Sequence, residues 1–342
     1  MLDDKTYISR FDSDDALGVT MHQWMQLEME FDVPKLSSKV SNIVFAGMGG
    51  SALSAELSLV WPGYSVPFEI SRAYELPKYV DEKTLVIISS YSGNTEETVA
   101  SLSDALSKKA QIVVIASGGQ LSKLASEKDL TCVKLPEDLQ PRHAVLYGFK
   151  VLVTILERSG FVKENMAERE IHQTAEFLKG SLGHWGPSVK TADNLAKQLA
   201  QNIVGKTPII YGGLLYPAAY KWKINMNENA KNTAWCNQYS EFNHNEFLGW
   251  VSHPIEKPFA VFDLISSFDH PQIKKRFEVT DKLLSGKRPK ATEIHAEGKT
   301  KLEQLLWAVA LGDMVSLYLA LLNGVNPTPV DLMDKLKKEL KS

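Results

Sequence analysis

Short apolar runs alternate with longer amphipathic segments along most of the 342-residue chain. The runs are rich in β-branched residues, which is typical of strands buried on both faces of a parallel sheet. They lie at residues 42–46, 66–70, 85–88, 112–116, 131–135, 207–211, 259–265 and 291–296. Strands separated by helical patterns imply βαβ units. The sequence therefore predicts an α/β fold with two doubly wound parallel sheets flanked by helices.

The same pattern predicts five segments. We expect a helical arm at 1–40, an α/β domain at 41–160, a helical linker at 161–204, a second α/β domain at 205–325 and a carboxy-terminal helix at 326–342. Residues 301–322 are too apolar for a surface helix, so they predict a central or interface helix. Asp313 within this run argues against a membrane span. Thr328 and Pro329 have the character of an N-cap and a first helical residue.

Three hydroxyl residues crowd the point where one predicted strand meets the next helix. The run 85–88 ends before Ser90, Ser92 and Thr95, and Thr95 opens an amphipathic segment. The carboxyl ends of strands bind ligands in open α/β sheets, and free amides at a helix start favour an anion. We expect these hydroxyls to hold a phosphate. The alternative is an ordinary Ser/Thr helix cap, which the acidic residues at 96–97 also favour.

A glycine turn follows the first predicted strand and carries Gly49, Gly50 and Ser51. Glycines let a backbone approach a ligand closely. Residues 47–52 also fit the degenerate dinucleotide fingerprint G-x-G-x-x-A, with Glu69 where a ribose-binding acid would lie. The nicotinamide interpretation thus stays open. The second polar turn at 90–95, which a dinucleotide site does not need, favours one small anion instead.

Three further residues are candidates for chemistry. Arg142 follows Pro141 at a predicted helix start, where a cation opposes the helix dipole and a ligand role is plausible beside a solvated one. Glu228 lies among three asparagines, a composition that suggests a polar pocket or a frayed helix end. Asn243 and Glu246 resemble a capping box that places His244 in a first helical turn, where the dipole lowers the pKa of the imidazole.

Thr328 and Lys335 are seven residues apart and can share one helix face. The alternative for Lys335 is a solvated basic tail.

Composition narrows the class of function. A net charge of −3 gives no electrostatic footprint for nucleic acid or an anionic membrane. The amino terminus lacks the layout of a signal peptide. Two distant cysteines, Cys132 and Cys236, favour a reducing cytoplasm over a disulfide framework. Neither metal-ligand spacing nor a G-x-S-x-G motif occurs, so we expect no metal and no cofactor.

Six separated motifs resemble those of the bifunctional phosphoglucose/phosphomannose isomerases, metal-free enzymes with two sugar isomerase (SIS) domains of flavodoxin-like fold. The motifs are Gly-Met-Gly-Gly-Ser at 47–51, Ser-Tyr-Ser-Gly-Asn-Thr-Glu-Glu-Thr at 90–98, Pro-Arg at 141–142, Glu-Asn-Ala-Lys at 228–231, Asn-His-Asn-Glu at 243–246 and Pro-Thr-Pro-Val at 327–330. The longer amino-terminal arm, the longer 266–300 stretch and Ala52-Leu53 depart from the family pattern and bear on substrate preference.

The resemblance implies aldose–ketose isomerisation of a hexose 6-phosphate, with glucose and mannose epimers both used. It assigns the phosphate to Ser51, Ser90, Ser92 and Thr95, beside the Gly49–Gly50 backbone. It makes Glu228 the base of a cis-enediol mechanism, Arg142 the partner of the enediolate and His244 an aid to ring opening. Thr328 and Lys335 would line the sugar end. It further implies a small-molecule sugar-phosphate partner, a cytoplasmic location and a homodimer in which His244 acts across the interface.

Two rivals come from related proteins. An isomerase of the glucosamine-6-phosphate synthase type requires an amino-terminal glutaminase domain with a nucleophilic cysteine. A phosphosugar-sensing regulator requires a DNA-binding helix-turn-helix and a basic patch, and residues 1–40 are instead acidic.

Overall fold

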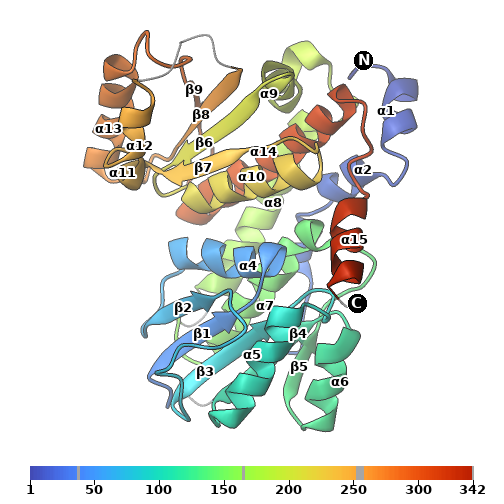
Figure 1. Ribbon diagram of the computed structural model, residues 1–342, viewed down its shortest axis with the longest axis vertical. Coiled ribbons are helices and arrows are strands. Elements are labelled where there is room, and N and C mark those ends of the chain that lie inside the picture. The colour runs from blue at the N-terminus through green and yellow to red at the C-terminus, as the bar shows by residue number, and fades with distance from the viewer. Residues whose placement is uncertain (37–38, 164–165, 252–257, 341–342) are drawn as a thin grey trace. The chain divides into compact units, whose positions relative to one another are not determined.

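The structure is a computed structural model that describes residues 1–36, 39–163, 166–251 and 258–340. Its contacts divide the chain into two compact units, each built on one sheet (Figure 1). The first-sheet unit is residues 23–177, and the second-sheet unit combines residues 1–22 with 178–342. The predicted segment boundaries fall after residues 40, 160, 204 and 325, whereas the contacts divide the chain after 22 and 177. The latter point falls inside α8 (Ala167–Trp185).

The first-sheet unit holds a five-stranded parallel sheet in the order β2-β1-β3-β4-β5. The strands are β1 (Asn42–Ala46), β2 (Phe68–Ser71), β3 (Thr84–Ser89), β4 (Gln111–Ala116) and β5 (Thr131–Lys134). Helices α5 (Glu96–Ser107) and α6 (Gly119–Glu127) bury Leu102 and Leu121 against one face. Helices α4 (Gly49–Val60) and α7 (Val145–Arg158) pack together on the opposite face (Figure 1).

The second-sheet unit holds a four-stranded parallel sheet in the order β7-β6-β8-β9. The strands are β6 (Thr207–Gly212), β7 (Trp235–Gln238), β8 (Phe259–Ile265) and β9 (Thr292–His295). Helices α11 (Tyr239–Phe242) and α13 (Pro271–Leu283) pack an aromatic cluster on one face, with Phe277 against Tyr239. Helices α9 (Leu195–Ile203), α10 (Tyr216–Glu228) and α12 (Glu246–Gly249) and a short 3₁₀ turn at Thr191–Asp193 also belong to this unit.

The predicted α/β class with two parallel sheets flanked by helices is confirmed. The two sheets share one strand order, because β6, β7, β8 and β9 are arranged as β1, β2, β3 and β4 are. In this order the direction of winding reverses between β1 and β3, and between β6 and β8. Ligands of open α/β sheets bind at such switch points. The order is that of flavodoxin-like folds rather than the 3-2-1-4-5-6 order of dinucleotide-binding domains.

The long apolar helix α14 (Lys301–Leu322) is central to its unit. It packs against α9 and α10, and 94% of its most apolar window is buried. Its length and composition would allow it to cross a membrane, but the buried core helices of soluble proteins can have the same length and composition. Of the two predictions for this helix, the central one is confirmed. Its apolar surface is covered within the chain and therefore gives no reason for a dimer.

The predicted helical arm is three short helices followed by a non-helical stretch: α1 (Lys5–Phe11), α2 (Ala16–Met21) and α3 (Met25–Glu28). The first two belong to the second-sheet unit, where the Tyr7 hydroxyl donates to the carbonyl of Leu321 at 2.7 Å. The third belongs to the first-sheet unit, where the Gln26 side chain bonds the backbone at His143 and Tyr147. The arm thus packs into both cores as structural support.

The last helix, α15 (Asp331–Glu339), begins later than predicted. Val330, not Thr328, is its N-cap. The amide of Thr328 donates instead to the Asn326 side chain at 2.9 Å, which holds this segment as a turn. Thr328 therefore precedes the helix that carries Lys335, and the shared helix face predicted for the two residues is wrong.

Candidate active site

Hydroxyl groups gather at the switch point of the first sheet. Ser90 follows β3 directly, and its Oγ lies 2.8 Å from the Oγ1 of Thr95. Thr95 has the N-cap position of α5, yet its side chain makes no cap hydrogen bond. A plain helix cap would direct this hydroxyl to the helix amides. The structure instead pairs two hydroxyls beside a helix start without a side-chain cap, an arrangement suited to an anion.

The turn after β1 joins this cluster. Ser51 lies in the first turn of α4, and its Oγ accepts a hydrogen bond from the Tyr91 amide at 3.1 Å. The two turns meet because β1 and β3 are adjacent parallel strands. Gly49 opens α4, and Gly50 follows it. A Cβ at Gly50 would lie 2.8 Å from the carbonyl oxygen of Pro141, so a side chain here would displace the backbone before Arg142.

The remaining residues of the 90–95 turn keep its shape. Ser92 is exposed, and its Oγ accepts from the Asn94 amide at 3.3 Å. Gly93 has φ of +65°, and a Cβ there would lie 1.8 Å from the Gly118 carbonyl oxygen. Only glycine fits this position. Glycine adopts this left-handed backbone conformation without the steric cost that a side chain would add.

Arg142 is buried in a 3₁₀ turn, Pro141–His143, just before α7. The α-helix therefore begins at Val145, four residues after the predicted start at Pro141. The Arg142 Cα lies 3.5 Å from the Cβ position of Gly50, which places this residue against the glycine turn. A guanidinium is always charged, so Arg142 brings a cation into this buried turn, where its Nη1 donates to the Gln140 side chain at 3.5 Å.

Tyr91 connects the hydroxyl turn to the loop that leads to Arg142. Its phenol donates to the carbonyl of Pro136 at 2.8 Å and accepts from the Leu139 amide at 3.1 Å. Burial raises the pKa of Tyr91, so the phenol keeps the proton that it donates.

The nicotinamide alternative loses support in the same unit. Glu69 accepts a hydrogen bond from Tyr79 at 2.5 Å, and the strand order is not that of a dinucleotide fold.

Glu228 is the last residue of α10 and is half-buried. The asparagines around it have structural roles. Asn225 and Asn229 donate to the side chains of Asp313 and Ser316 on α14 at 2.5 and 2.9 Å. Asn227 accepts from the Ala234 amide at 3.1 Å. The composition therefore reflects how the end of this helix is anchored, and it gives no independent sign of a ligand.

His244 is exposed in the turn between α11 and α12, and the predicted capping box is wrong. Asn245 is the N-cap of α12, while Asn243 ends α11. The Glu246 carboxylate accepts from the Tyr211 hydroxyl and from Asn237 at 2.8 Å, so it does not return to a cap. His244 therefore does not lie in a first helical turn, contrary to the prediction. Thr328 is half-buried, and Lys335 is exposed on α15.

The switch point of the second sheet is filled by a carboxylate. Asp269 is buried, and its two oxygens accept from the amides of Leu214 and Ser266 at 2.6 and 2.8 Å. These amides belong to the turns after β6 and β8, which correspond in strand order to the turns of Ser51 and Ser90. Burial raises the pKa of Asp269, and the two amide bonds oppose that shift.

Sequence reasoning missed two features near Glu228. Lys221 and Asp313 form a buried ion pair at 2.5 Å, and Lys231 bonds several carbonyls at the end of α10. Lys231 was within a quoted motif but had no role assigned, while Lys221 carried no signal. Within the described residues, no three His, Cys, Asp or Glu side chains form a group that could hold a metal ion.

Comparisons with known protein families match the two parts of the chain separately. The SIS domain model matches residues 35–147, and the model of the bacterial phospho-glucose isomerase C-terminal SIS domain matches residues 192–340. A bifunctional phosphoglucose/phosphomannose isomerase of Caldicellulosiruptor bescii is 37% identical over 306 residues, which cover 88% of this chain and 90% of that protein. A D-glucosamine-6-phosphate 4-epimerase of Sulfolobus acidocaldarius is 34% identical over 217 residues, 63% of this chain and 65% of that protein.

Among solved structures, a glucose-6-phosphate isomerase like protein from Thermus thermophilus has a TM-score of 0.68 and 17% identity, with 98% of each chain covered. This similarity shows the fold. The family models and the relative that aligns along nearly the whole chain go further: the chain belongs to the family of bifunctional phosphoglucose/phosphomannose isomerases.

Proposed function

We propose that the chain interconverts glucose 6-phosphate and mannose 6-phosphate with fructose 6-phosphate. The observation that carries the proposal is the hydroxyl cluster of Ser51, Ser90 and Thr95 at the switch point of a sheet in a chain of this family. The hydroxyls and the uncapped amides can bind a phosphate monoester without a basic side chain in the turn. Ser92 contributes a further hydroxyl at the exposed side, and the Gly49–Gly50 backbone approaches the ligand.

The proposed chemistry moves one proton between two carbons. The Glu228 carboxylate removes the proton from C2 of the open-chain aldose, and the electron pair forms the double bond of a cis-enediolate. The conjugate acid returns the proton to C1 while a second proton passes from the C2 hydroxyl to the C1 oxygen, which gives the ketose. Arg142 stabilises the oxygen on which negative charge develops, the kind of electrostatic effect that often dominates a rate. His244 assists ring opening, and Thr328 and Lys335 contact the sugar end. Return of the proton to either face of C2 accounts for two epimers.

No step of this mechanism uses a metal ion or a cofactor, because a carboxylate moves the proton and a guanidinium carries the charge. We expect purified protein to form fructose 6-phosphate from both aldoses at unchanged rates after exhaustive treatment with EDTA. Loss of mannose 6-phosphate turnover that zinc restores would reject a single metal-independent site. Glucosamine 6-phosphate should be included as a third sugar, because one relative carries the name of an epimerase for it.

Replacement of Thr95 by alanine should raise KM for the sugar phosphate with little change in kcat. A hydrogen bond to a charged ligand contributes about 1.5–3 kcal/mol, which corresponds to roughly 10- to 150-fold in affinity. Because the Thr95 side chain makes no cap bond, the stability of α5 should change little. Ser103→Ala on the same helix is the matched control, since that exposed hydroxyl donates to the Val99 carbonyl at 3.4 Å and has no place in the proposed site. An unchanged KM in Thr95→Ala would make the turn a structural feature.

We further propose a cytoplasmic homodimer. Both cysteines are unpaired thiols, as a reducing compartment favours. The support for a dimer comes from exposed apolar side chains near His244. Leu248 and Val251 follow it closely in sequence and are 71% and 55% exposed, and Leu283, which is 54% exposed, lines the same pocket as Asn243 and Phe247. Neighbouring exposed apolar side chains of this kind mark interaction surfaces. Light scattering tests the proposal, and a monomer at working concentration would reject it.

A further inference from the structure

Lys231 follows α10 in a conformation that is uncommon for a residue with a side chain. Its φ is +53°, in the left-handed region. Its ammonium group bonds four backbone carbonyl oxygens, at 2.8 Å for Glu228, 3.3 Å for Asn229, 3.1 Å for Asn326 and 3.1 Å for Pro327. An ammonium has three N–H donors, so at least one of them is shared between two oxygens.

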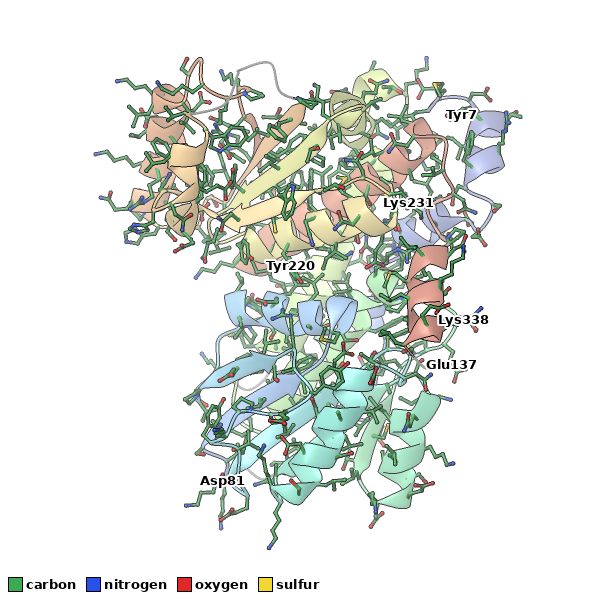
Figure 2. All side chains as sticks on the ribbon, in the orientation of Figure 1. Tyr7, Asp81, Glu137, Tyr220, Lys231 and Lys338 are labelled. Atoms are coloured by element: carbon green, nitrogen blue, oxygen red, sulfur yellow. The ribbon has the colours of Figure 1, made fainter. Side chains whose placement is uncertain are left out.

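The four carbonyls come from two segments that are nearly 100 residues apart in sequence. Glu228 and Asn229 end α10, where a cation also interacts favourably with the helix dipole. Asn326 and Pro327 directly precede Thr328. Figure 2 labels Lys231 where the end of α10 meets this loop. A further bond joins the same segments, because the Asn323 side chain donates to the Ala230 carbonyl at 3.1 Å.

Asn326 extends the connection to the amino terminus. Its side chain accepts from the Thr328 amide at 2.9 Å and donates to the Asp14 carboxylate at 2.8 Å and the Ser13 hydroxyl at 3.1 Å. The segment before Thr328 is therefore bonded on one side to Lys231 and on the other to the loop between α1 and α2. A strained backbone conformation persists only where surrounding contacts determine it, and such positions cluster at functional sites.

We propose that Lys231 is a positioning residue that fixes the last turn of α10, and with it Glu228, to the segment that carries Thr328. The inference rests on the proposed function, in which Glu228 is the base and Thr328 contacts the sugar. A compact ammonium suits the role because it can donate to carbonyls in several directions at once. The charge of Lys231 acts through backbone placement and does not touch the reacting atoms.

The test is Lys231→Met, which keeps most of the side-chain length and removes every donor. We expect kcat for both aldoses to fall by at least about tenfold, since a misplacement of 1 Å can cost about 100-fold in rate. KM should change by less than about threefold, because the phosphate-binding hydroxyls belong to the other unit. Exchange of the C2 proton with solvent should fall in parallel with kcat. Lys223→Met, on the same helix, is the control and should keep the wild-type rate.

Two further variants separate a positioning role from a structural one. Lys231→Arg, which keeps the charge and several donors, should have a kcat between those of the wild type and Lys231→Met, and it serves if the methionine variant does not fold. In a Glu228→Gln background, Lys231→Met should lower the residual rate no further, because both changes act on one group. An unchanged kcat in folded Lys231→Met, or a change confined to KM, would overturn the inference. An inactive wild-type protein would instead reject the proposed function.

Discussion

Glu228→Gln should lower kcat by about 100-fold or more while sugar-phosphate binding stays nearly unchanged. Glutamine keeps the shape of the side chain and cannot accept the C2 proton, and loss of a general base typically removes about 10²- to 10⁴-fold in rate. Exchange of the C2 proton with solvent, followed by NMR in D₂O, measures the step directly. Calorimetric titration of the same variant with fructose 6-phosphate measures binding.

The matched control is Glu176→Gln, because Glu176 is an exposed carboxylate on α8 that has no place in the proposed mechanism. It should retain full turnover. Residual turnover above about a tenth of the wild-type rate in Glu228→Gln is more than loss of a general base allows. Such a rate would assign the proton transfer to another residue. Lys231 would then not be a positioning residue for the catalytic base.

Asp313→Ala should destabilise the second-sheet unit by about 3–5 kcal/mol, the usual cost of leaving one member of a buried ion pair uncompensated. Asp313 and Lys221 are 3% and 2% exposed, and their charged groups lie 2.5 Å apart. The same carboxylate oxygen accepts from Asn225 at 2.5 Å, so two buried donors lose their acceptor. Urea unfolding followed by near-ultraviolet circular dichroism measures the loss.

Two further variants test whether the broken ion pair causes the loss of stability in Asp313→Ala. Asp334→Ala removes an exposed pair with Lys337 at 3.9 Å and should change stability by less than about 1 kcal/mol. The double variant Lys221→Met/Asp313→Leu removes both charges, so it should be more stable than Asp313→Ala alone. If the double variant is as unstable as the single one, the loss comes from packing and not from the charge of Lys221.

The strands were predictable wherever an apolar run carried the signal. β1 and β8 have the predicted bounds, because buried parallel strands read as continuous β-branched and aromatic runs. β7 (Trp235–Gln238) was missed, because this short edge strand mixes polar and apolar residues, with two of its four residues exposed. The capping box at 243–246 matched a pattern in residue types, but Glu246 bonds Tyr211, a partner 35 residues away that no local pattern reveals.

In the candidate site, too, contacts that follow from local patterns were predictable and contacts between distant residues were not. The contact of Ser90 with Thr95 follows from a strand-to-helix turn, and the addition of Ser51 follows from the pairing of two parallel strands. Both were accessible to sequence reasoning. The bonds of Lys231 were not predictable, because every residue has a backbone carbonyl and the sequence does not mark which carbonyls will be acceptors. The Lys221–Asp313 pair was not predictable either, because it joins positions 92 residues apart. Features of this kind depend on how distant helices pack, which composition and periodicity do not encode.

Asp269 makes the two sheets unequal in spite of their common strand order. Its carboxylate is a tethered anion that already engages the amides of both turns at the second switch point. A soluble anion would have to compete with an intramolecular one, whose effective concentration reaches the millimolar range even for flexible tethers. A Cβ at Gly213 would lie 2.3 Å from the same carboxylate, so the polypeptide closes tightly around this internal ligand. In the proposed function the turns of the first sheet bind an external anion, whereas the corresponding turns of the second sheet already hold the protein's own carboxylate.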